Sequence, residues 1–250
     1  MDLQGFRQEL EKLDAYRYMG KIEKIVGMTI EASGPECNIG DVCRIYSKDM
    51  KSFIHAEVVG FQSDKVLLMP YTDIEGVGPG SIVDNTGAKL MVKTGNALIG
   101  RIIDAIGNPI DGGGAINYTD SVSISGNPVN PLTRPKISEP IELGVKAIDG
   151  LLTLGKGQRI GIFAGSGVGK STLMGMIARK VKADINVIAL VGERGREVRE
   201  FIENDLGEEG MARSVVVVAT SDQPAMMRAK CPMTATAIAE YFMSQGKDVL

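Results

Sequence analysis

The chain has 250 residues, with 28 lysine and arginine residues against 31 aspartate and glutamate residues and a formal net charge of −3. This length suits one large domain or two smaller ones, and a hydrophobic fraction of 44% is enough to bury a sizeable core. The charge balance gives no argument for a strongly basic nucleic-acid surface. Three cysteines without a CxxC pair and a single histidine offer no zinc site, so we expect reduced thiols.

The N-terminal segment predicts a helix but no membrane anchor. No apolar run is long enough to span a bilayer, and the N-terminus lacks the form of a signal peptide, so we expect a cytoplasmic protein. Residues 1–19 predict an amphipathic helix, because Leu3, Phe6, Leu10 and Leu13 recur at spacings of three and four. Two roles fit this helix: packing on its own domain, or docking on a partner helix or a membrane surface.

Residues 20–92 predict a small β-barrel domain. Short β-type runs alternate there with turn residues, the last expected turn being Asp84–Gly87. The runs are Lys21–Val26, Met28–Glu31, Val42–Tyr46, Ile54–Phe61, Val66–Met69 and Lys89–Val92. Some small barrels bind single-stranded nucleic acid through stacked aromatic residues and a basic groove, but the aromatic residues here have no basic cluster around them. We therefore expect a structural or oligomer-forming barrel.

Residues 93–250 predict an α/β domain with a parallel sheet, because strand and helix patterns alternate. Its first segment, from Leu98 to Ile106, predicts a short helix that ends at Gly107. Further strands are expected at 159–163, 185–191 and 215–219, and helices at 173–181, 198–206 and 224–245, the second ending at Gly207 and the last capped by Asp222. Another strand begins at Val249, and its uncovered edge suggests part of a longer protein.

The segment after the 159–163 strand predicts a phosphate-binding loop. Its residues are Ala164, Gly165, Ser166, Gly167, Val168, Gly169, Lys170, Ser171 and Thr172. Ala164 replaces the first glycine of G-x-x-x-x-G-K-[ST], where a small residue suffices. Glycines let backbone N–H groups converge on an anion, and the helix N-terminus adds its dipole. Lys170 would reach the β- and γ-phosphates and Ser171 would bind Mg²⁺. The alternative, a glycine-rich turn that binds nothing, fits the strand–loop–helix context poorly.

Glu193 and Arg194 follow the 185–191 strand, so they are expected at the same end of the sheet as the loop. A carboxylate there can orient and deprotonate the water that attacks the γ-phosphate, and an arginine can compensate phosphate charge. We therefore predict that Glu193, Arg194 and Lys170 are catalytic. The charged residues that follow, Arg196, Glu197, Arg199 and Glu200, are interpreted as a solvated face of a helix. Asp222 is a candidate magnesium ligand, although a helix cap suits it better.

Two long runs, Arg159–Leu173 and Val187–Phe201, resemble the ATPases of bacterial type III protein export. The similarity is greatest to the flagellar export ATPases and extends more distantly to the catalytic β subunit of F-type ATP synthases. Ser214–Pro224 and Ala237–Phe242 fit the same pattern, and the similarity covers the chain from about Gly20 to Leu250.

The resemblance implies a six-stranded N-terminal β-barrel and a RecA-like P-loop ATPase domain that binds ATP and Mg²⁺. It implies a homohexamer that energises or primes flagellar protein export at the inner face of the cell membrane. It also implies a stalk-like regulatory partner at the N-terminal helix, contacts with an export gate and with substrate–chaperone complexes, and no nucleic acid. By position, Gly165 to Thr172 would bind phosphate, and Glu193 and Arg194 would match the family's catalytic glutamate and the arginine beside it.

Three alternatives remain: a virulence-type secretion ATPase, a ring-shaped RNA translocase, and a noncatalytic nucleotide-binding subunit. The negative net charge and the barrel without a basic aromatic face argue against the translocase. Glu193 argues against a noncatalytic subunit, in which an amide would stand there. In the family a metal-associated aspartate, the adenine pocket and a trans arginine come later in the chain. We therefore expect the 250 residues alone to bind nucleotide weakly and to hydrolyse almost none.

Overall fold

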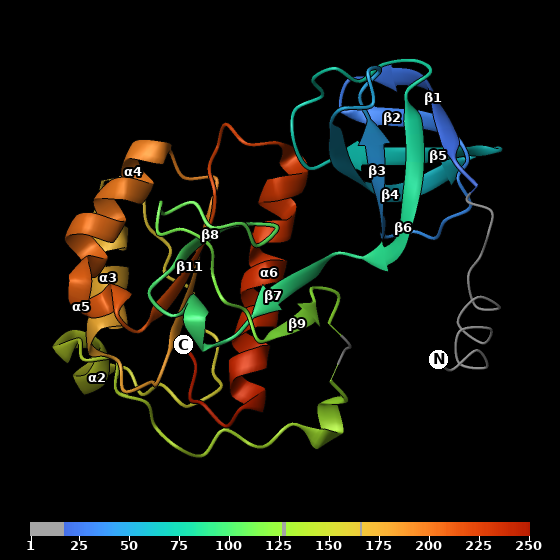
Figure 1. Ribbon diagram of the computed structural model, residues 1–250. Helices are drawn as coiled ribbons and strands as arrows, with labels where there is room; N and C mark the ends of the chain where they lie inside the picture. The colour runs from blue at the N-terminus through green and yellow to red at the C-terminus, as the bar shows by residue number, and fades with distance from the viewer. Residues whose placement is uncertain (1–17, 127–128, 166) are drawn as a thin grey trace, which may run out of the picture. The chain divides into compact units, whose positions relative to one another are not determined.

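The structure, a computed structural model, describes residues 18–126, 129–165 and 167–250 (Figure 1). The helix expected over residues 1–19 lies outside the described residues except for its last two positions, and Ser166 of the loop lies outside them as well. The chain divides into two units, the first ending at Lys89 and the second beginning at Leu90. Among the described residues, no helix is both long and apolar enough to cross a membrane.

The first unit is a closed barrel of six strands, as predicted (Figure 1). The strands are β1 (Gly20–Val26), β2 (Thr29–Ser33), β3 (Asp41–Tyr46), β4 (Phe53–Gln62), β5 (Lys65–Pro70) and β6 (Ile82–Lys89). They pair antiparallel in the order β1-β2-β5-β4-β3-β6, which leaves no open edge. Alternate side chains point inward, and Ile30, Ile45 and Leu68 are fully buried in the core.

The sixth strand differs from the prediction. The expected turn Asp84–Gly87 is part of β6, which closes the barrel between β1 and β3. The polar residues are accommodated because they find partners: the amide of Asn85 donates to the carbonyl of Glu36 at 3.0 Å and to the carboxylate of Asp41 at 3.2 Å. The run Lys89–Val92, expected as a barrel strand, instead leads into β7 (Met91–Thr94), which pairs with β9 (Asp120–Ser123) in the second unit.

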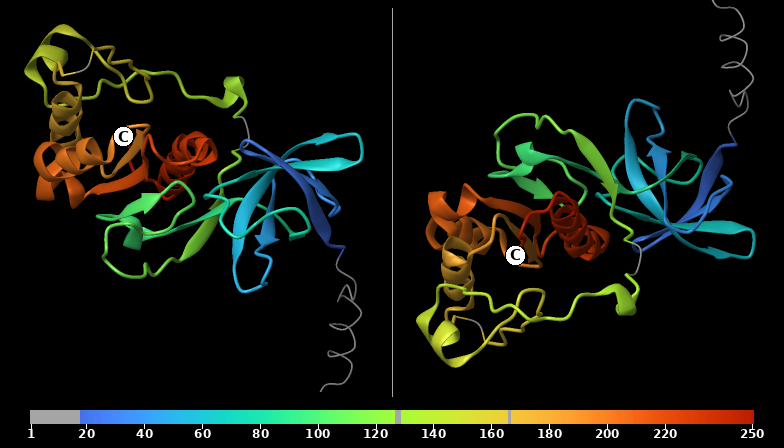
Figure 2. Two further views of the ribbon diagram at one scale, coloured as in Figure 1. Left: turned by 90° about the horizontal axis from the view of Figure 1, so that it is seen from above. Right: turned by 90° about the horizontal axis from the view of Figure 1, so that it is seen from below.

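The second unit is built on a parallel sheet in the order β10-β11-β8. The predicted strands at 185–191 and 215–219 are confirmed as β10 (Asn186–Val191) and β11 (Ser214–Ala219). A parallel bridge from Ile185 to Val249 adds the start of a further strand to the other edge of β10. The predicted last helix is confirmed as α6 (Ala225–Ser244) on one face, and α3 (Lys170–Lys180) lies on the other (Figures 1 and 2).

The prediction of a helix from Leu98 to Ile106 is wrong. A short 3₁₀ turn, η1 (Asn96–Leu98), is followed by β8 (Ile102–Asp104), which pairs with β11. The β-branched isoleucines favour a strand when a neighbouring edge is available. Asp104 then forces a tight turn, because its carboxylate accepts hydrogen bonds from the backbone N–H groups of Ile106 and Asn108 at 3.0 and 2.8 Å.

The predicted helix over 198–206 is present but irregular. It consists of α4 (Gly195–Glu200) and a π-helical turn, η3 (Phe201–Leu206). Gly207 interrupts the helix with a φ of 61°, but α5 (Gly207–Met211) follows at once. The predicted cap at Asp222 is wrong, because Pro224 occupies the N-cap position of α6. A hydrogen bond with Thr220 instead lowers the pKa of the Asp222 carboxyl.

The remaining short elements are η2 (Pro131–Thr133) and α2 (Lys146–Leu151). All three cysteines are free thiols, as predicted.

Candidate functional site

The glycine loop lies directly before α3, and it leaves the N-terminus of that helix open. Gly169 occupies the N-cap position with a φ of 92°, and it has no side chain to cap the first turn. Gly167 also has a positive φ, 75°, which L-residues with a Cβ rarely adopt. Backbone in this conformation turns successive N–H groups toward one point, as an anion-binding nest requires. The uncapped N–H groups of α3 add to this electropositive surface.

The segment before the loop is not the buried strand that the sequence predicts. Residues Arg159–Phe163 form no strand, and the Phe163 side chain is 97% exposed. The segment that lies beside β10 is instead Asp248–Leu250, where the carbonyl of Leu250 accepts from the N–H of Val187 at 2.8 Å. Ile160 and Ile162 instead line an apolar cavity of about 450 Å³ next to β10.

Glu193 lies next to the loop, where the sequence places it. Its carboxylate oxygen is 4.0 Å from the ammonium nitrogen of Lys170, and the two side chains are 40% and 43% exposed. The turn after β10 depends on Gly192, whose φ is 73° and whose N–H donates to the carbonyl of Ala219. The carbonyl of Glu193 in turn accepts from the N–H of Ser221 at 3.0 Å. The ends of β10 and β11 therefore position this carboxylate.

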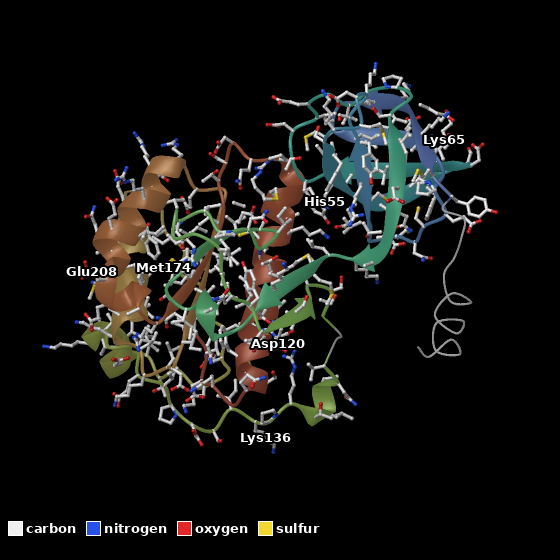
Figure 3. All side chains as sticks on the ribbon, in the orientation of Figure 1. His55, Lys65, Asp120, Lys136, Met174 and Glu208 are labelled. Carbon is white, nitrogen blue, oxygen red and sulfur yellow. The ribbon has the colours of Figure 1, made fainter. Side chains whose placement is uncertain are left out.

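A cavity of about 380 Å³ separates the loop from the helix that follows Glu193. One wall is the loop itself with Lys170, Ser171 and Thr172. The opposite wall contains Glu193, Glu197, Glu200, Phe201 and Asp205. An adjoining space of about 240 Å³ reaches Met174 of α3, which is labelled in Figure 3. Both spaces are large enough for phosphate groups and water.

Arg194 is placed differently from Glu193. Its guanidinium lies 3.4 Å from the carboxylate of Glu197, its side chain is 68% exposed, and it is not among the residues that line the cavity in the described chain. The interpretation of 196–200 as a solvated face is confirmed for Arg196, Arg199 and Glu200, which are exposed, and Arg199 pairs with Glu203 at 2.7 Å. Glu197 is half-buried, and both Glu197 and Glu200 also line the cavity. Helical spacing could have indicated this shared position, because Glu197, Glu200 and Phe201 fall on one face of a continuous helix.

The cavity is strongly acidic for a phosphate site. Lys170 is its single lysine among the described lining residues, which include four carboxylates, from Glu193, Glu197, Glu200 and Asp205. These oxygens and the Ser171 hydroxyl are the donors that Mg²⁺ prefers. Among the residues that the structure describes, however, no three His, Cys, Asp or Glu side chains lie close enough together to hold a metal ion by themselves. Such a donor set suits an ion that arrives with phosphate and takes one or two protein ligands.

Comparison with known proteins gives matches over both units. A family model described as "ATP synthase alpha/beta family, beta-barrel domain" matches residues 22–87. A second, described as "ATP synthase alpha/beta family, nucleotide-binding domain", matches residues 144–250.

Two relatives and one solved structure illustrate these matches. The "Flagellum-specific ATP synthase" of Bacillus subtilis is 57% identical over 100% of this chain and 57% of its own length. The "Type 3 secretion system ATPase" of Xanthomonas euvesicatoria is 48% identical over 97% of this chain and 55% of its own. The structure of the assembled ATPase EscN with its central stalk EscO, from an enteropathogenic E. coli type III secretion system, has a TM-score of 0.83 and 47% identity over 92% of this chain and 56% of its own. The chain thus spans little more than half the length of the curated relatives it matches.

Proposed function

Because the chain belongs to the ATP synthase alpha/beta family, we propose that it forms the barrel and phosphate-binding part of an Mg²⁺-dependent ATPase that energises or primes type III protein export. Flagellar protein export is the first choice, because a relative with that name is 57% identical over the whole chain. Export of virulence proteins is the second, on the basis of the type 3 secretion ATPase at 48% identity.

The observation that carries the proposal is the pair formed by Lys170 and Glu193 across the cavity, 4.0 Å apart. The loop N–H groups and Lys170 would bind the β- and γ-phosphates. Glu193, within reach of the terminal phosphate, would orient the attacking water and accept its proton. Arg194 pairs with Glu197 at 3.4 Å and does not line the described part of the cavity, so we assign it a secondary role in compensating phosphate charge.

Magnesium fits the same site. ATP adds several negative charges to a cavity that already contains four carboxylates and one lysine, so phosphate binding there needs a cation to offset the repulsion. The Ser171 hydroxyl, in the first turn of α3, would be its protein ligand from the loop. The bound ion would supply charge neutralisation at the β- and γ-phosphate oxygens.

We also propose that the protein assembles with copies of itself and with a stalk-like partner. EscN is described as an assembled ATPase in complex with a central stalk, and this supports a ring of identical subunits and a stalk-like partner for our chain. We propose a homohexamer, with the N-terminal helix as a contact for the regulatory partner. We further propose that the protein contacts an export gate and substrate–chaperone complexes, and that it lies at the inner face of the cell membrane.

The test is phosphate release by the protein expressed from its complete reading frame, measured against protein concentration. We expect specific activity to rise with concentration, because sites between subunits form only on assembly. Glu193→Gln should lower kcat by about 10²-fold or more while ATP still binds. The matched control is Arg199→Gln on the exposed face of α4, which should retain activity. Turnover that is indifferent to Glu193 would contradict the proposal and favour a noncatalytic nucleotide-binding subunit.

A further inference from the structure

The helix α3 and the π-helical turn η3 approach each other at a point where only glycine fits. Gly175 is buried in the middle of α3. A Cβ atom at this position would overlap the carbonyl oxygen of Asp205 and lie 2.7 Å from its carbonyl carbon. These are backbone atoms, which cannot rotate away as a flexible side chain could. Any larger residue at position 175 would therefore force α3 and η3 apart.

The π-helical turn explains why the approach is so close. Hydrogen bonds in a π-helix span five residues rather than four, so its backbone is wider than that of an α-helix. The same turn contributes Phe201 and Asp205 to the wall of the phosphate cavity. It is also continuous with α4, which begins two residues after Glu193. At Gly175, α3, which follows the phosphate loop, therefore contacts η3, which belongs to the cavity wall that contains the carboxylates.

The far end of α3 is anchored and cannot retreat from such a contact. The carbonyl of Ala178 accepts from the Asn186 amide and from the Arg213 guanidinium, both at 2.7 Å. Arg213 also donates to the carbonyl of Val181 at 3.0 Å. A push at Gly175 would therefore tilt α3 about its C-terminal end. The largest displacement would occur at the N-terminal end, which contains Lys170 and Ser171.

We propose that Gly175 is a positioning residue, which sets the distance between the phosphate loop and Glu193. The inference rests on the proposed function, because it assigns the groups that bind phosphate to α3 and the group that activates water to the opposite wall. The loop, Lys170 and Ser171 move together with α3, so a tilt leaves their mutual geometry intact. Glu193 stays with β10, so the same tilt changes its distance to the bound phosphate.

The experiment is Gly175→Ala in the protein expressed from its complete reading frame, with kcat, KM and the Kd for MgADP measured together. We expect kcat to fall by about 30- to 100-fold, because displacements near 1 Å have such effects on positioned groups. KM and Kd should change by less than about threefold, since the binding groups keep their arrangement. The control is Gly150→Ala in α2, where a Cβ meets open space. Alanine favours a helix over glycine, so helix propensity cannot explain a loss.

A double-mutant cycle with Glu193→Gln separates positioning from a general structural defect. In the Gly175→Ala background, Glu193→Gln should cost at most about a third of the fold-loss in kcat that it causes in the wild type. An equal cost in both backgrounds would overturn the inference, and so would a loss of MgADP binding in parallel with kcat. If wild-type turnover itself is indifferent to Glu193, the proposed function fails instead.

A second variant covers the case in which Gly175→Ala does not fold. Arg213→Ala removes the guanidinium part of the C-terminal anchor of α3, leaves the hydrogen bond from the Asn186 amide, and does not touch the cavity. We expect kcat to fall several-fold while the Kd for MgADP is retained, because the loop then shifts relative to Glu193. An unchanged kcat in this variant would overturn the inference.

Discussion

Asp111 organises the loop after β8 through hydrogen bonds to both side chain and backbone. Its carboxylate accepts from the Arg101 guanidinium at 2.6 and 2.8 Å, and from the N–H groups of Ile102 and Gly113 at 3.0 and 2.9 Å. The hydrogen bond with Arg101, more than any other cause, holds the pKa of the Asp111 carboxyl well below its usual range. The loop therefore depends on one ionised side chain.

Replacing Asp111 with alanine should lower the free energy of unfolding by about 1–3 kcal/mol at pH 7, because several N–H donors lose a charged acceptor. The folded pKa is depressed, so this stabilisation is complete above about pH 4, the unfolded value, and declines as pH falls toward the folded pKa. Urea unfolding at pH 7 and pH 3 checks both points. The exposed Asp73 provides the control as Asp73→Ala. A difference between wild type and Asp111→Ala that is the same at both pH values would contradict the argument.

At the residue scale, the sequence predicts the residues that adjoin a strand or a helix, but not which face of a helix a side chain occupies. The glycine loop can be placed because it precedes a helix pattern, and Glu193 can be placed because it follows a strand pattern. Glu200 is exposed, as the sequence predicts, but the sequence does not show that Glu197 and Glu200 also line the cavity. Their orientation depends on where α4 begins and on the π-helical turn that follows, and no residue type in Phe201–Leu206 indicates a π-helix.

At the scale of elements, the C-terminal end of α3 is held by one arginine side chain. Arg213 donates to the carbonyls of Ala178, Val181 and Ala183, which a helix end otherwise leaves without partners. A guanidinium can reach several carbonyls at once, whereas an ammonium group is a single point charge. Arg213, which directly precedes β11, thereby helps to fix the direction of the helix that begins at the phosphate loop.

Arg213→Ala should lower the free energy of unfolding by about 2 kcal/mol, because three carbonyl acceptors lose a charged donor. Arg213→Lys should recover less than half of this loss. Urea denaturation gives the energies, and hydrogen exchange should show faster exchange within Lys170–Lys180. Arg199→Ala is the matched control, because its ion pair with Glu203 is exposed and solvent screens it. Equal stability of Arg213→Ala and wild type would show that water replaces the guanidinium at no cost.

Pairing between distant strands explains which elements the sequence cannot predict. The helix α6 is predicted within one residue at each end, because its pattern is long. The sequence around β8 has apolar residues at helical spacing, so it predicts a helix. Its three residues form a strand because they pair with β11, which is distant in the sequence. Arg159–Phe163 has the composition of a buried strand but pairs with no strand in the described chain. Composition alone cannot report whether a segment finds a strand to pair with.

At the scale of the whole molecule, each unit has its own hydrophobic core. The barrel core is formed by residues between Ile22 and Val83. The clusters of the second unit lie between Leu143 and Val218, around α3, β10 and β11. Separate cores allow separate unfolding, because cooperativity requires shared buried contacts. The phosphate loop and its cavity belong to the second unit alone.

Calorimetry of the 250-residue chain should therefore show two unfolding transitions, of which only one responds to nucleotide. Saturation with MgADP at 100 times its Kd would stabilise the second unit by about 2.7 kcal/mol and leave the barrel transition in place. Lys170→Ala, which removes the lysine of the cavity, should abolish the shift, with the same variant in the absence of nucleotide as its reference. A single transition that shifts as a whole would mean that the barrel unfolds only together with the nucleotide-binding unit, and binding at the loop would then stabilise both.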